Sequence, residues 1–485
     1  MKESIELSRT TYHIYCVEDF MNLNNIFPQD IRKLNTIRDF EHMAKLPPAA
    51  GLKKASAKFG SGHENTWYEY VPGSYKGDRK VPLIVQIHGG GNDGRRWADY
   101  TIWHLLAEEH GFIVIYPNSQ TPERWNCDED DIEYVAKLIA HIKGKYSIDE
   151  SRVYMQGMSN GEMMTLAFTM VHPELLAAAG NMTGPSPAEM IGTERPAGAL
   201  PLIQMRGEKD IFFQFPDEPP KDIYEKRYSM NDINREIWRE VNGTADLPVL
   251  TINGKDNFLV FKGNAAPIIN WEIKNMGHRE PADGAQVLWD LLYSKCSRVN
   301  GKLVIDALDS SLKGDDDGAA IAIGSNKVFI KDHTEAMHDS DHGYARYIAP
   351  PKSSSHFGKF EVDEMFETRG FYIPAEGLKA IFGAKVTMVD PGDSAIVETP
   401  DGNTYQFYSN SLLVKHNDKY TAMRKPCELI AGIFLVPIDE IAGDLLGKFV
   451  SVAADVMYIA NHYAELGRYT ARILRELLGG EQVTF

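Results

Sequence analysis

The segment Gly157-Met158-Ser159-Asn160-Gly161 is the most informative short pattern in the chain. It lies between an expected strand at Val153–Met155 and an apolar helix expected from about 161 to 171. A serine between two such glycines is typical of a sharp strand-to-helix turn, in which the small neighbours let the hydroxyl stand above a sheet. The pattern predicts Ser159 as a nucleophile, and an ordinary glycine-rich turn is the alternative.

A nucleophilic serine needs a base, and the base needs an acid that fixes its tautomer. On a sheet of this type the acid and then the histidine follow later strands, at their carboxyl ends. Asp210 follows the expected strand Leu202–Arg206 and is the predicted acid, with Glu208 as the alternative. His278 follows the expected strand Ile268–Ile273 and is the predicted base; a surface histidine is the alternative.

A glycine run, His88-Gly89-Gly90-Gly91, ends an expected strand upstream of the serine. Backbone N–H groups of Gly89 and Gly90, together with that of Asn160, are predicted to form an oxyanion hole for a substrate carbonyl. A plain turn and a phosphate cradle are the alternatives. A Walker-type loop would continue with Gly-Lys-Ser or Gly-Lys-Thr, and Asn92-Asp93-Gly94 does not.

Three aromatic residues near these loops are candidates for substrate binding: Trp97, Trp125 and Phe212. Aromatic side chains between a loop and a core serve packing as readily as they serve a cleft, so core packing is the alternative for each.

The elements that must position these residues alternate between strands and helices. Short apolar runs ended by glycine or proline, such as 83–87 and 112–116, are typical of strands buried on both faces of a parallel sheet. Helical spacing at 97–110 and 130–146 separates such runs. The predicted fold class is α/β, with a doubly wound, mostly parallel sheet.

After about residue 300 the sequence consists of short alternating segments with few helical stretches, which predicts a second domain. Residues 1–61 are expected to be an N-terminal extension packed on or leading into the catalytic domain, 62–298 the catalytic domain, and 300–485 a smaller α+β domain. The last contains an internal repeat, in which 370–383 matches 433–447 with one inserted residue. In each copy we expect a strand that ends at a proline, then a helix that stops at a glycine, and then a further β strand.

Composition excludes several classes of protein. The net charge of −17 over 485 residues argues against nucleic acid or anionic lipid as a partner. No apolar stretch approaches the roughly twenty residues of a membrane-spanning helix. The four cysteines are too widely spaced for a zinc module, and the acidic segments 314–318 and 338–342 are interpreted as solvated loops, not metal sites. The start of the chain shows no apolar signal core, which predicts a cytoplasmic protein, or an extracellular one if a leader was removed.

With these motifs in view, residues from about 62 to 298 resemble carbohydrate esterase family 1 and the polyhydroxybutyrate depolymerases, a group that includes feruloyl and acetylxylan esterases. The resemblance rests on the strand leading to His88-Gly89, the Ser159 turn, Gly207-x-x-Asp210 and Gly277-His278. It implies the α/β-hydrolase fold and a serine esterase that needs no metal or organic cofactor. Glu162 departs from the family pattern, and a carboxylate close to the oxyanion would oppose its negative charge. Arg279-Glu280 departs from it as well, which favours a polar or charged group in the substrate.

The resemblance implies feruloyl or acetyl esters of plant cell-wall polysaccharide as substrates, whether small molecules or polysaccharide-linked. A polyester depolymerase or a peptidase on the same triad is the nearest alternative. Residues 300–485 resemble the copper amine oxidase N-terminal-like domain, which implies an accessory role in attachment or in homo-oligomer assembly without bound copper. An alternative of another class is a non-catalytic binding protein that works through this second domain.

Overall fold

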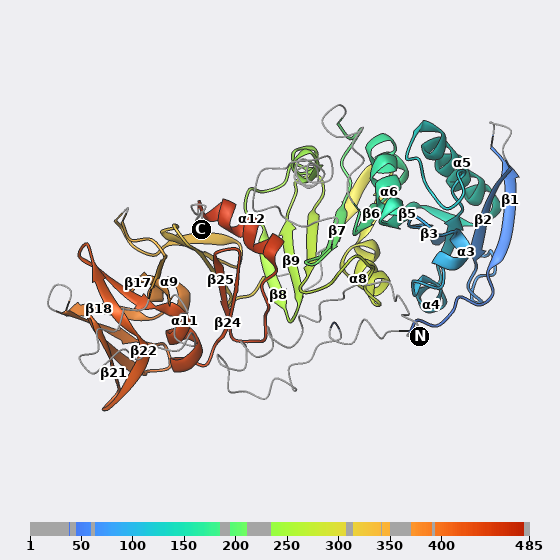
Figure 1. Ribbon diagram of the computed structural model, residues 1–485. Coiled ribbons are helices and arrows are strands. Elements are labelled where there is room, and N and C mark those ends of the chain that lie inside the picture. The colour runs from blue at the N-terminus through green and yellow to red at the C-terminus, as the bar shows by residue number, and fades with distance from the viewer. Residues whose placement is uncertain are drawn as a thin grey trace, which may run out of the picture.

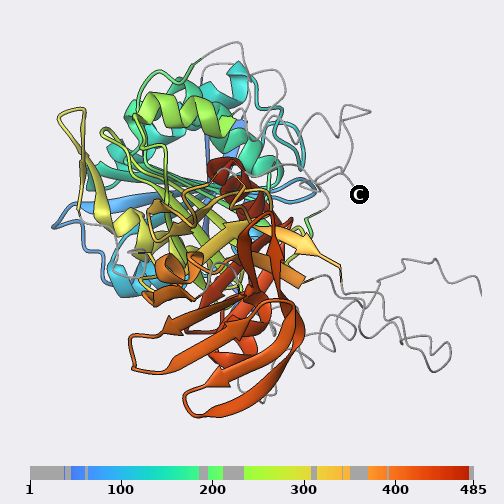
Figure 2. The same ribbon diagram turned by 90° about the vertical axis from the view of Figure 1, so that its left-hand side faces the viewer.

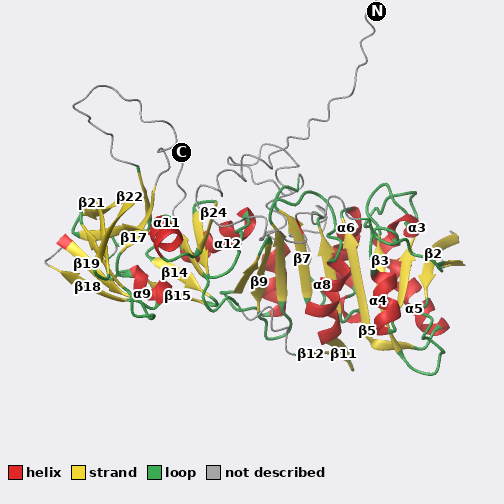
Figure 3. Ribbon diagram, turned by 90° about the horizontal axis from the view of Figure 1, so that it is seen from below, coloured by secondary structure: helices red, strands yellow, loops and turns green. Residues whose placement is uncertain are grey.

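The computed structural model describes residues 38, 45–59, 64–184, 195–210, 234–306, 314–340, 342–349, 370–389 and 393–479. Its largest element is a ten-stranded sheet with the order β1-β2-β4-β3-β5-β6-β7-β10-β9-β8 (Figures 1 and 3). The strands are β1 (Lys53–Lys58), β2 (Glu64–Tyr70), β3 (Val81–Ile87), β4 (Ile113–Pro117), β5 (Ile148–Met158), β6 (Ala178–Met182), β7 (Leu202–Gly207), β8 (Val249–Asn253), β9 (Asp256–Phe261) and β10 (Ile268–Ile273).

The six central strands, from β4 to β10, run parallel to one another, and the outer strands on both sides are antiparallel. Strand β3 is the switch point, because the chain moves to one side of it for β4 and to the other for β5. Ligands bind at the carboxyl ends of strands beside such a point in open α/β sheets. The predicted α/β fold with a mostly parallel sheet is confirmed.

Helices cover both faces of this sheet (Figure 1). The longer ones are α4 (Trp103–His110), α5 (Glu129–Lys145), α6 (Asn160–Val171) and α8 (Gly284–Leu291), joined by the short α3 (Gly94–Trp97) and the 3-10 turns Pro173–Leu175 and Tyr293–Lys295. Helices α5 and α6 pack their apolar side chains into one buried cluster, and α4 and α8 into the cluster on the opposite face. The sheet is therefore buried on both sides, which explains its continuous apolar strands.

The sequence prediction missed some elements of this half. The helix expected over 97–110 is interrupted, since α3 ends at Trp97 and α4 begins at Trp103. The antiparallel hairpin β8–β9 was not predicted. Strand β1 also begins the sheet before residue 62, although its sequence KKASAK has no apolar run, because it pairs with β2 along its whole length.

Outside the ten-stranded sheet, the residues that the structure describes form three further sheets. These are a hairpin of β11 (Cys296–Val299) and β12 (Lys302–Ile305), a five-stranded sheet with the order β15-β14-β13-β25-β24, and an eight-stranded sheet with the order β16-β17-β23-β22-β21-β20-β19-β18. Their strands are β13 (Ala319–Ala322), β14 (Lys327–Ile330), β15 (His333–Ala336), β16 (Arg346–Ile348), β17 (Gly370–Pro374), β18 (Lys385–Val389), β19 (Ser394–Glu398), β20 (Thr404–Tyr408), β21 (Ser411–His416), β22 (Lys419–Ile430), β23 (Ile433–Pro437), β24 (Phe449–Ala453) and β25 (Val456–Ala460).

The two matching sequence segments share one order of elements. Strand β17 is followed by α9 (Gly377–Phe382) and β18, and β23 is followed by α11 (Ile438–Glu440), the π-helical turn Ile441–Leu445 and β24. The two leading strands pair antiparallel, with Ile373 opposite Val436. The strands that end the two segments lie in different sheets, because β18 belongs to the eight-stranded sheet and β24 to the five-stranded one.

The parts before and after residue 300 share a buried apolar cluster. It includes Leu259 and Phe261 of β9 together with Phe329 of β14 and Tyr458 of β25. Helix α12 (Arg468–Leu478) adds its buried side chains to the same cluster, and the parts before and after residue 300 therefore pack closely on one another.

One acidic segment takes part in this junction. The sequence interpretation placed residues 314–318 in a solvated loop, but the Asp315 carboxylate is largely buried and accepts hydrogen bonds from Ile252 N, at 2.8 Å, and from the Tyr458 hydroxyl. For Asp315 that interpretation is wrong. Within the described ranges, no helix is both long and apolar enough to cross a membrane.

Candidate active site

Three loops at the carboxyl ends of β5, β7 and β10 bring the predicted serine, acid and histidine together. His278 Nε2 lies 2.9 Å from Ser159 Oγ, and His278 Nδ1 lies 2.9 Å from Asp210 Oδ2. The Asp210 side chain is fully buried, whereas about a fifth of the His278 side chain is exposed. Since a carboxylate only accepts hydrogen bonds, His278 Nδ1–H donates to Asp210 and leaves Nε2 to accept the Ser159 hydroxyl proton.

Ser159 sits on a strained turn between β5 and α6. Its φ of 58° and ψ of −120° are unusual for a residue with a side chain, and its N–H donates to Met182 O at 2.9 Å, which pins the turn to β6. The flanking glycines are required by space. A Cβ on Gly157 would lie 2.0 Å from Gly161 O, and a Cβ on Gly161 would lie 2.3 Å from Ile87 O.

Alanine at Gly161 is expected to destabilise the fold by about 3 kcal/mol, because the clash is with backbone atoms of β3 that cannot turn away. Gly144→Ala is the matched control: a Cβ there meets nothing within 4 Å, and alanine in helix α5 is expected to add up to about 1 kcal/mol. Thermal unfolding of both variants measures the difference. Equal melting temperatures would contradict the tight turn.

The glycine run after β3 lies directly against the serine turn. A Cβ on Gly89 would approach Met158 O to 3.2 Å and Ser159 Cβ to 3.5 Å, and one on Gly90 would approach Asn160 Cβ to 3.7 Å. Asn160 is the first residue of α6, so its N–H has no acceptor within the helix. The three residues predicted to supply oxyanion donors therefore surround the serine.

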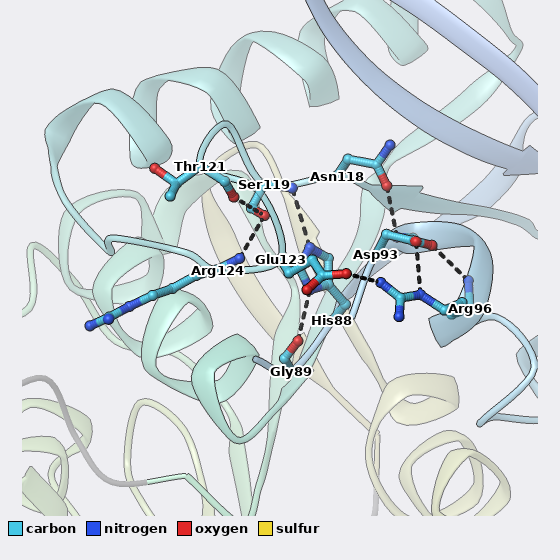
Figure 4. A network of polar contacts seen from close by, with 10 residues as sticks. His88, Gly89, Asp93, Arg96, Asn118, Ser119, Thr121, Glu123 and Arg124 are labelled. Carbon is cyan, nitrogen blue, oxygen red and sulfur yellow. Dashed lines mark hydrogen bonds and ion pairs between the residues drawn. The ribbon is translucent and has the colours of Figure 1, made fainter. Parts of the chain in front are cut away.

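A buried histidine and the loop Asn118–Trp125 hold this glycine run in place (Figure 4). His88 Nε2 accepts a hydrogen bond from Ser119 N at 3.2 Å, and Nδ1–H donates to Gly89 O at 2.9 Å. Burial lowers the pKa of His88, which favours the neutral ring that both bonds need. Gly91 N donates to Glu123 O, which joins the loop to the glycine run a second time.

Two aromatic residues predicted to bind substrate are buried instead. Trp97 is 4% exposed and Trp125 is 1% exposed, so neither offers a face to a substrate. Trp125 Nε1 donates to His88 O, and the Trp125 backbone exchanges two hydrogen bonds with the Asn160 side chain. Trp125 thus stabilises the serine turn through these hydrogen bonds. Phe212 lies outside the described residues.

The two carboxylates that depart from the pattern of the resembled esterases, Glu162 and Glu280, both have a pKa that is raised by burial. The Glu162 carboxylate is buried and accepts a hydrogen bond from Gly184 N. Burial raises its pKa well above the usual range, and the charge of Arg206 opposes that rise. A neutral acid does not oppose negative charge on a substrate oxygen, so the family departure at Glu162 leaves the site electrostatically usable.

Glu280, two residues after His278, is partly buried beside the polar side chain of Gln156. Burial raises its pKa to about 8, and the Gln156 hydrogen bond opposes the rise. Gln156 Oε1 also accepts hydrogen bonds from Trp103 Nε1 and Gln86 Nε2, both at 2.6 Å. The neutral acid is therefore the form that suits this position.

The free energy of unfolding is expected to fall between about pH 5 and pH 8 because of Glu280. The folded protein keeps this proton up to about pH 8, whereas the unfolded chain releases it near pH 4.3, so the folded state binds more protons in between and loses stability as the pH rises. Glu280→Gln should remove on the order of 3 kcal/mol of that loss of stability. The change in melting temperature between pH 5.5 and pH 8.5 measures the loss in each protein, and Glu109→Gln, at an exposed glutamate, is the control. An unchanged pH dependence in Glu280→Gln would refute this role.

Comparison with known proteins finds similarity over part of this site. Residues 67–192 match the model of the esterase PHB depolymerase family. The curated relatives include a bifunctional acetylxylan esterase/xylanase of Neocallimastix patriciarum, 30% identical over 131 residues, or 27% of this chain and 19% of that protein. A feruloyl esterase B of Neurospora crassa is 33% identical over 148 residues, covering 28% and 48% of the two chains.

A probable acetylxylan esterase A of Aspergillus fumigatus is 30% identical over 157 residues, covering 30% of this chain and 41% of that protein. Among solved structures, an acetyl xylan esterase from Aspergillus awamori is 19% identical, with a TM-score of 0.39 and coverage of 49% of this chain and 98% of that one. The chain thus spans half or less of the length of these curated relatives. The stretch from 67 to 192, which holds the glycine run and Ser159, is similar to the esterase PHB depolymerase family.

Proposed function

We propose that the protein is a serine carboxylesterase. The observation that carries the proposal is the continuous chain of contacts from Ser159 through His278 to Asp210, each 2.9 Å long. The similarity of residues 67–192 to esterases supports it independently, because that stretch includes the serine but neither the acid nor the histidine.

In the proposed reaction Ser159 Oγ attacks the ester carbonyl carbon while His278 Nε2 takes the hydroxyl proton. Asp210 holds the imidazole in the required tautomer and stabilises its positive charge. Backbone N–H groups of Asn160, Gly89 and Gly90 donate to the oxygen that becomes negative in the tetrahedral intermediate. The proton on His278 then passes to the leaving alcohol as the C–O bond breaks, which leaves an acyl-enzyme.

Water completes the cycle. His278 takes a proton from a water molecule, whose oxygen attacks the acyl carbonyl, and the same donors stabilise the second tetrahedral intermediate. Collapse of this intermediate releases the carboxylic acid and returns the proton to Ser159 Oγ. The residues of the site account for each proton transfer, so the proposed chemistry needs no metal or organic cofactor.

Feruloyl or acetyl esters of plant cell-wall polysaccharide are the proposed substrates, since the relatives are named feruloyl and acetylxylan esterases. The matching family model is named for polyhydroxybutyrate depolymerases, and a polyester is therefore the second candidate. For residues 300–485 we propose an accessory role like that of a copper amine oxidase N-terminal-like domain, on the strength of the shared element order around β17 and β23.

Labelling with a fluorophosphonate probe tests the proposal. The probe should attach to Ser159, because an activated serine displaces fluoride from phosphorus, and peptide mapping should find the adduct there. Heat-unfolded protein is the control, since unfolding separates the three residues. Labelling of folded and unfolded protein at the same slow rate would contradict an activated serine.

A further inference from the structure

The last helix of the described chain, α12, packs on the catalytic half. Figures 1 and 2 show it in red between the ten-stranded sheet and the C-terminal strands, and it contacts β9 on one side and β13, β14 and β25 on the other. Tyr469, Ile473 and Leu474 of this helix are buried in the apolar cluster that includes Phe261 of β9. The helix thus begins beside the strands that carry the acid and the histidine.

The first turn of α12 rests on two buried carboxylates of the catalytic half. Glu272 of β10 accepts hydrogen bonds from Tyr469 N at 3.0 Å and Thr470 N at 2.7 Å, and Glu208 accepts one from Arg468 N at 3.1 Å. Amide groups at the start of a helix have no acceptor within it and carry the positive end of its dipole, so they suit carboxylates. The contact is close, because a Cβ on Gly467 would lie 2.3 Å from Glu272 Cδ.

Glu208 joins the loops that carry Asp210 and His278. Its side chain is 3% exposed, and it accepts hydrogen bonds from Lys274 Nζ at 2.8 Å and from Asn275 N at 3.0 Å. The backbone adds a parallel connection, in which Glu208 N donates to Ile273 O and Lys209 N to Met276 O. The Glu208 carboxylate therefore fixes the distance between the loop before Asp210 and the loop before His278.

A second contact joins helix α12 to strand β7, just before the loop that carries Asp210. The Arg206 guanidinium lies 3.4 Å from the centre of the Tyr469 ring. Burial raises the pKa of Glu272, and the charge of Glu208 raises it further, so these two carboxylates repel each other. The N–H groups of α12 offset that repulsion, which makes the helix part of what holds Glu208 in position.

We propose that Glu208, held by the backbone N–H of Arg468, is a positioning residue for the Asp210–His278 pair, and that the C-terminal half thereby sets the catalytic rate. This inference rests on the proposed esterase function. It predicts that loss of one backbone N–H in α12 slows chemistry at Ser159 although no residue of the site has changed.

Arg468→Pro tests this directly. Proline lacks the N–H and is tolerated as the first residue of a helix, the place that Arg468 occupies. The preceding residue, Gly467, has φ −78° and ψ 151°, the extended conformation that proline requires of its predecessor. Arg468→Ala is the matched control, since it removes the exposed side chain and keeps the N–H.

The rate of fluorophosphonate labelling and kcat on p-nitrophenyl acetate are expected to fall about five- to tenfold in Arg468→Pro, with KM within twofold. Both values should stay within twofold of wild type in Arg468→Ala. The measurement is made at 25 °C on protein whose circular dichroism shows it folded, so a helix that served only stability would leave the rates unchanged. If Arg468→Pro does not fold, Glu208→Gln, which loses the charge and one acceptor oxygen, should show the same loss of kcat.

If the probe labels the wild type and the proline and alanine variants react at equal rates, the positioning inference is overturned and the esterase proposal stands. Absence of labelling in the wild type would instead overturn the esterase proposal. A proton NMR signal of His278 Nδ1–H, assigned by its loss in His278→Ala, gives a reading independent of ester chemistry. It should broaden through faster exchange in Arg468→Pro, and an unchanged signal would overturn the positioning role.

Discussion

Replacing Ser159 with alanine is expected to lower kcat on p-nitrophenyl acetate by roughly 10^5- to 10^6-fold, because the proposed mechanism has Ser159 as its nucleophile and no substitute for it. The melting temperature should change by less than about 2 °C. The Ser159 side chain hydrogen-bonds to His278, which is itself partly exposed, and alanine meets the same backbone strain that serine does. Hydrolysis would then continue only at the low rate that the oxyanion donors and binding can supply.

Ser297→Ala is the matched control, since Ser297 lies on strand β11, whose Arg298 donates to Leu176 O just before the start of β6, whereas Ser159 binds Met182 O at the other end of β6. It should turn over the ester at the wild-type rate. Turnover by Ser159→Ala within tenfold of wild type would remove Ser159 from the mechanism and direct attention to the C-terminal half of the chain.

Asp210→Asn is expected to lower kcat by about 10^4-fold with little change in KM. Asparagine keeps the size of the side chain but offers N–H donors where His278 Nδ1–H now meets a carboxylate, so the imidazole is held in the wrong tautomer and its positive form loses its partner. Because Asp210 is fully buried, no water can replace the missing charge. Initial rates at saturating ester measure the effect.

The control for charge loss is Asp290→Asn, an exposed carboxylate of helix α8 that bonds only to Gln286 among the contacts described. It should leave kcat unchanged. If Asp210→Asn retained more than a tenth of the wild-type kcat, Asp210 would not be the acid. Glu208 would not inherit the role, because its carboxylate is bound to Lys274, Asn275 and Arg468.

The central sheet could be predicted from the sequence because its strands are buried on both faces. Strand β10 was expected at Ile268–Ile273 and has those bounds, and all six of its residues are buried. Edge strands lack this signal. The sequence of β1, KKASAK, contains only lysines and small residues, and only its pairing with β2 makes it a strand.

The meeting of Ser159, Asp210 and His278 was predictable because each follows a strand that was expected to belong to a parallel sheet. Parallel strands bring their carboxyl ends to one edge of the sheet, so residues 119 positions apart, Ser159 and His278, meet there. Roles that depend on long-range packing could not be predicted, because no local sequence pattern indicates them. Trp125 supports the turn instead of lining a cleft, and Arg468 binds Glu208 across 260 residues of sequence.

Initial rates on methyl ferulate, acetylated xylan and a short hydroxybutyrate oligomer, each with wild type and Ser159→Ala, decide whether the chain is a serine carboxylesterase. Wild type should hydrolyse methyl ferulate or acetylated xylan, and the alanine variant should not. Serine-dependent hydrolysis of the hydroxybutyrate oligomer alone would keep the mechanism and change the substrate class. No serine-dependent hydrolysis of any of the three, or equal rates in both proteins, would contradict the claim that this chain is a serine carboxylesterase.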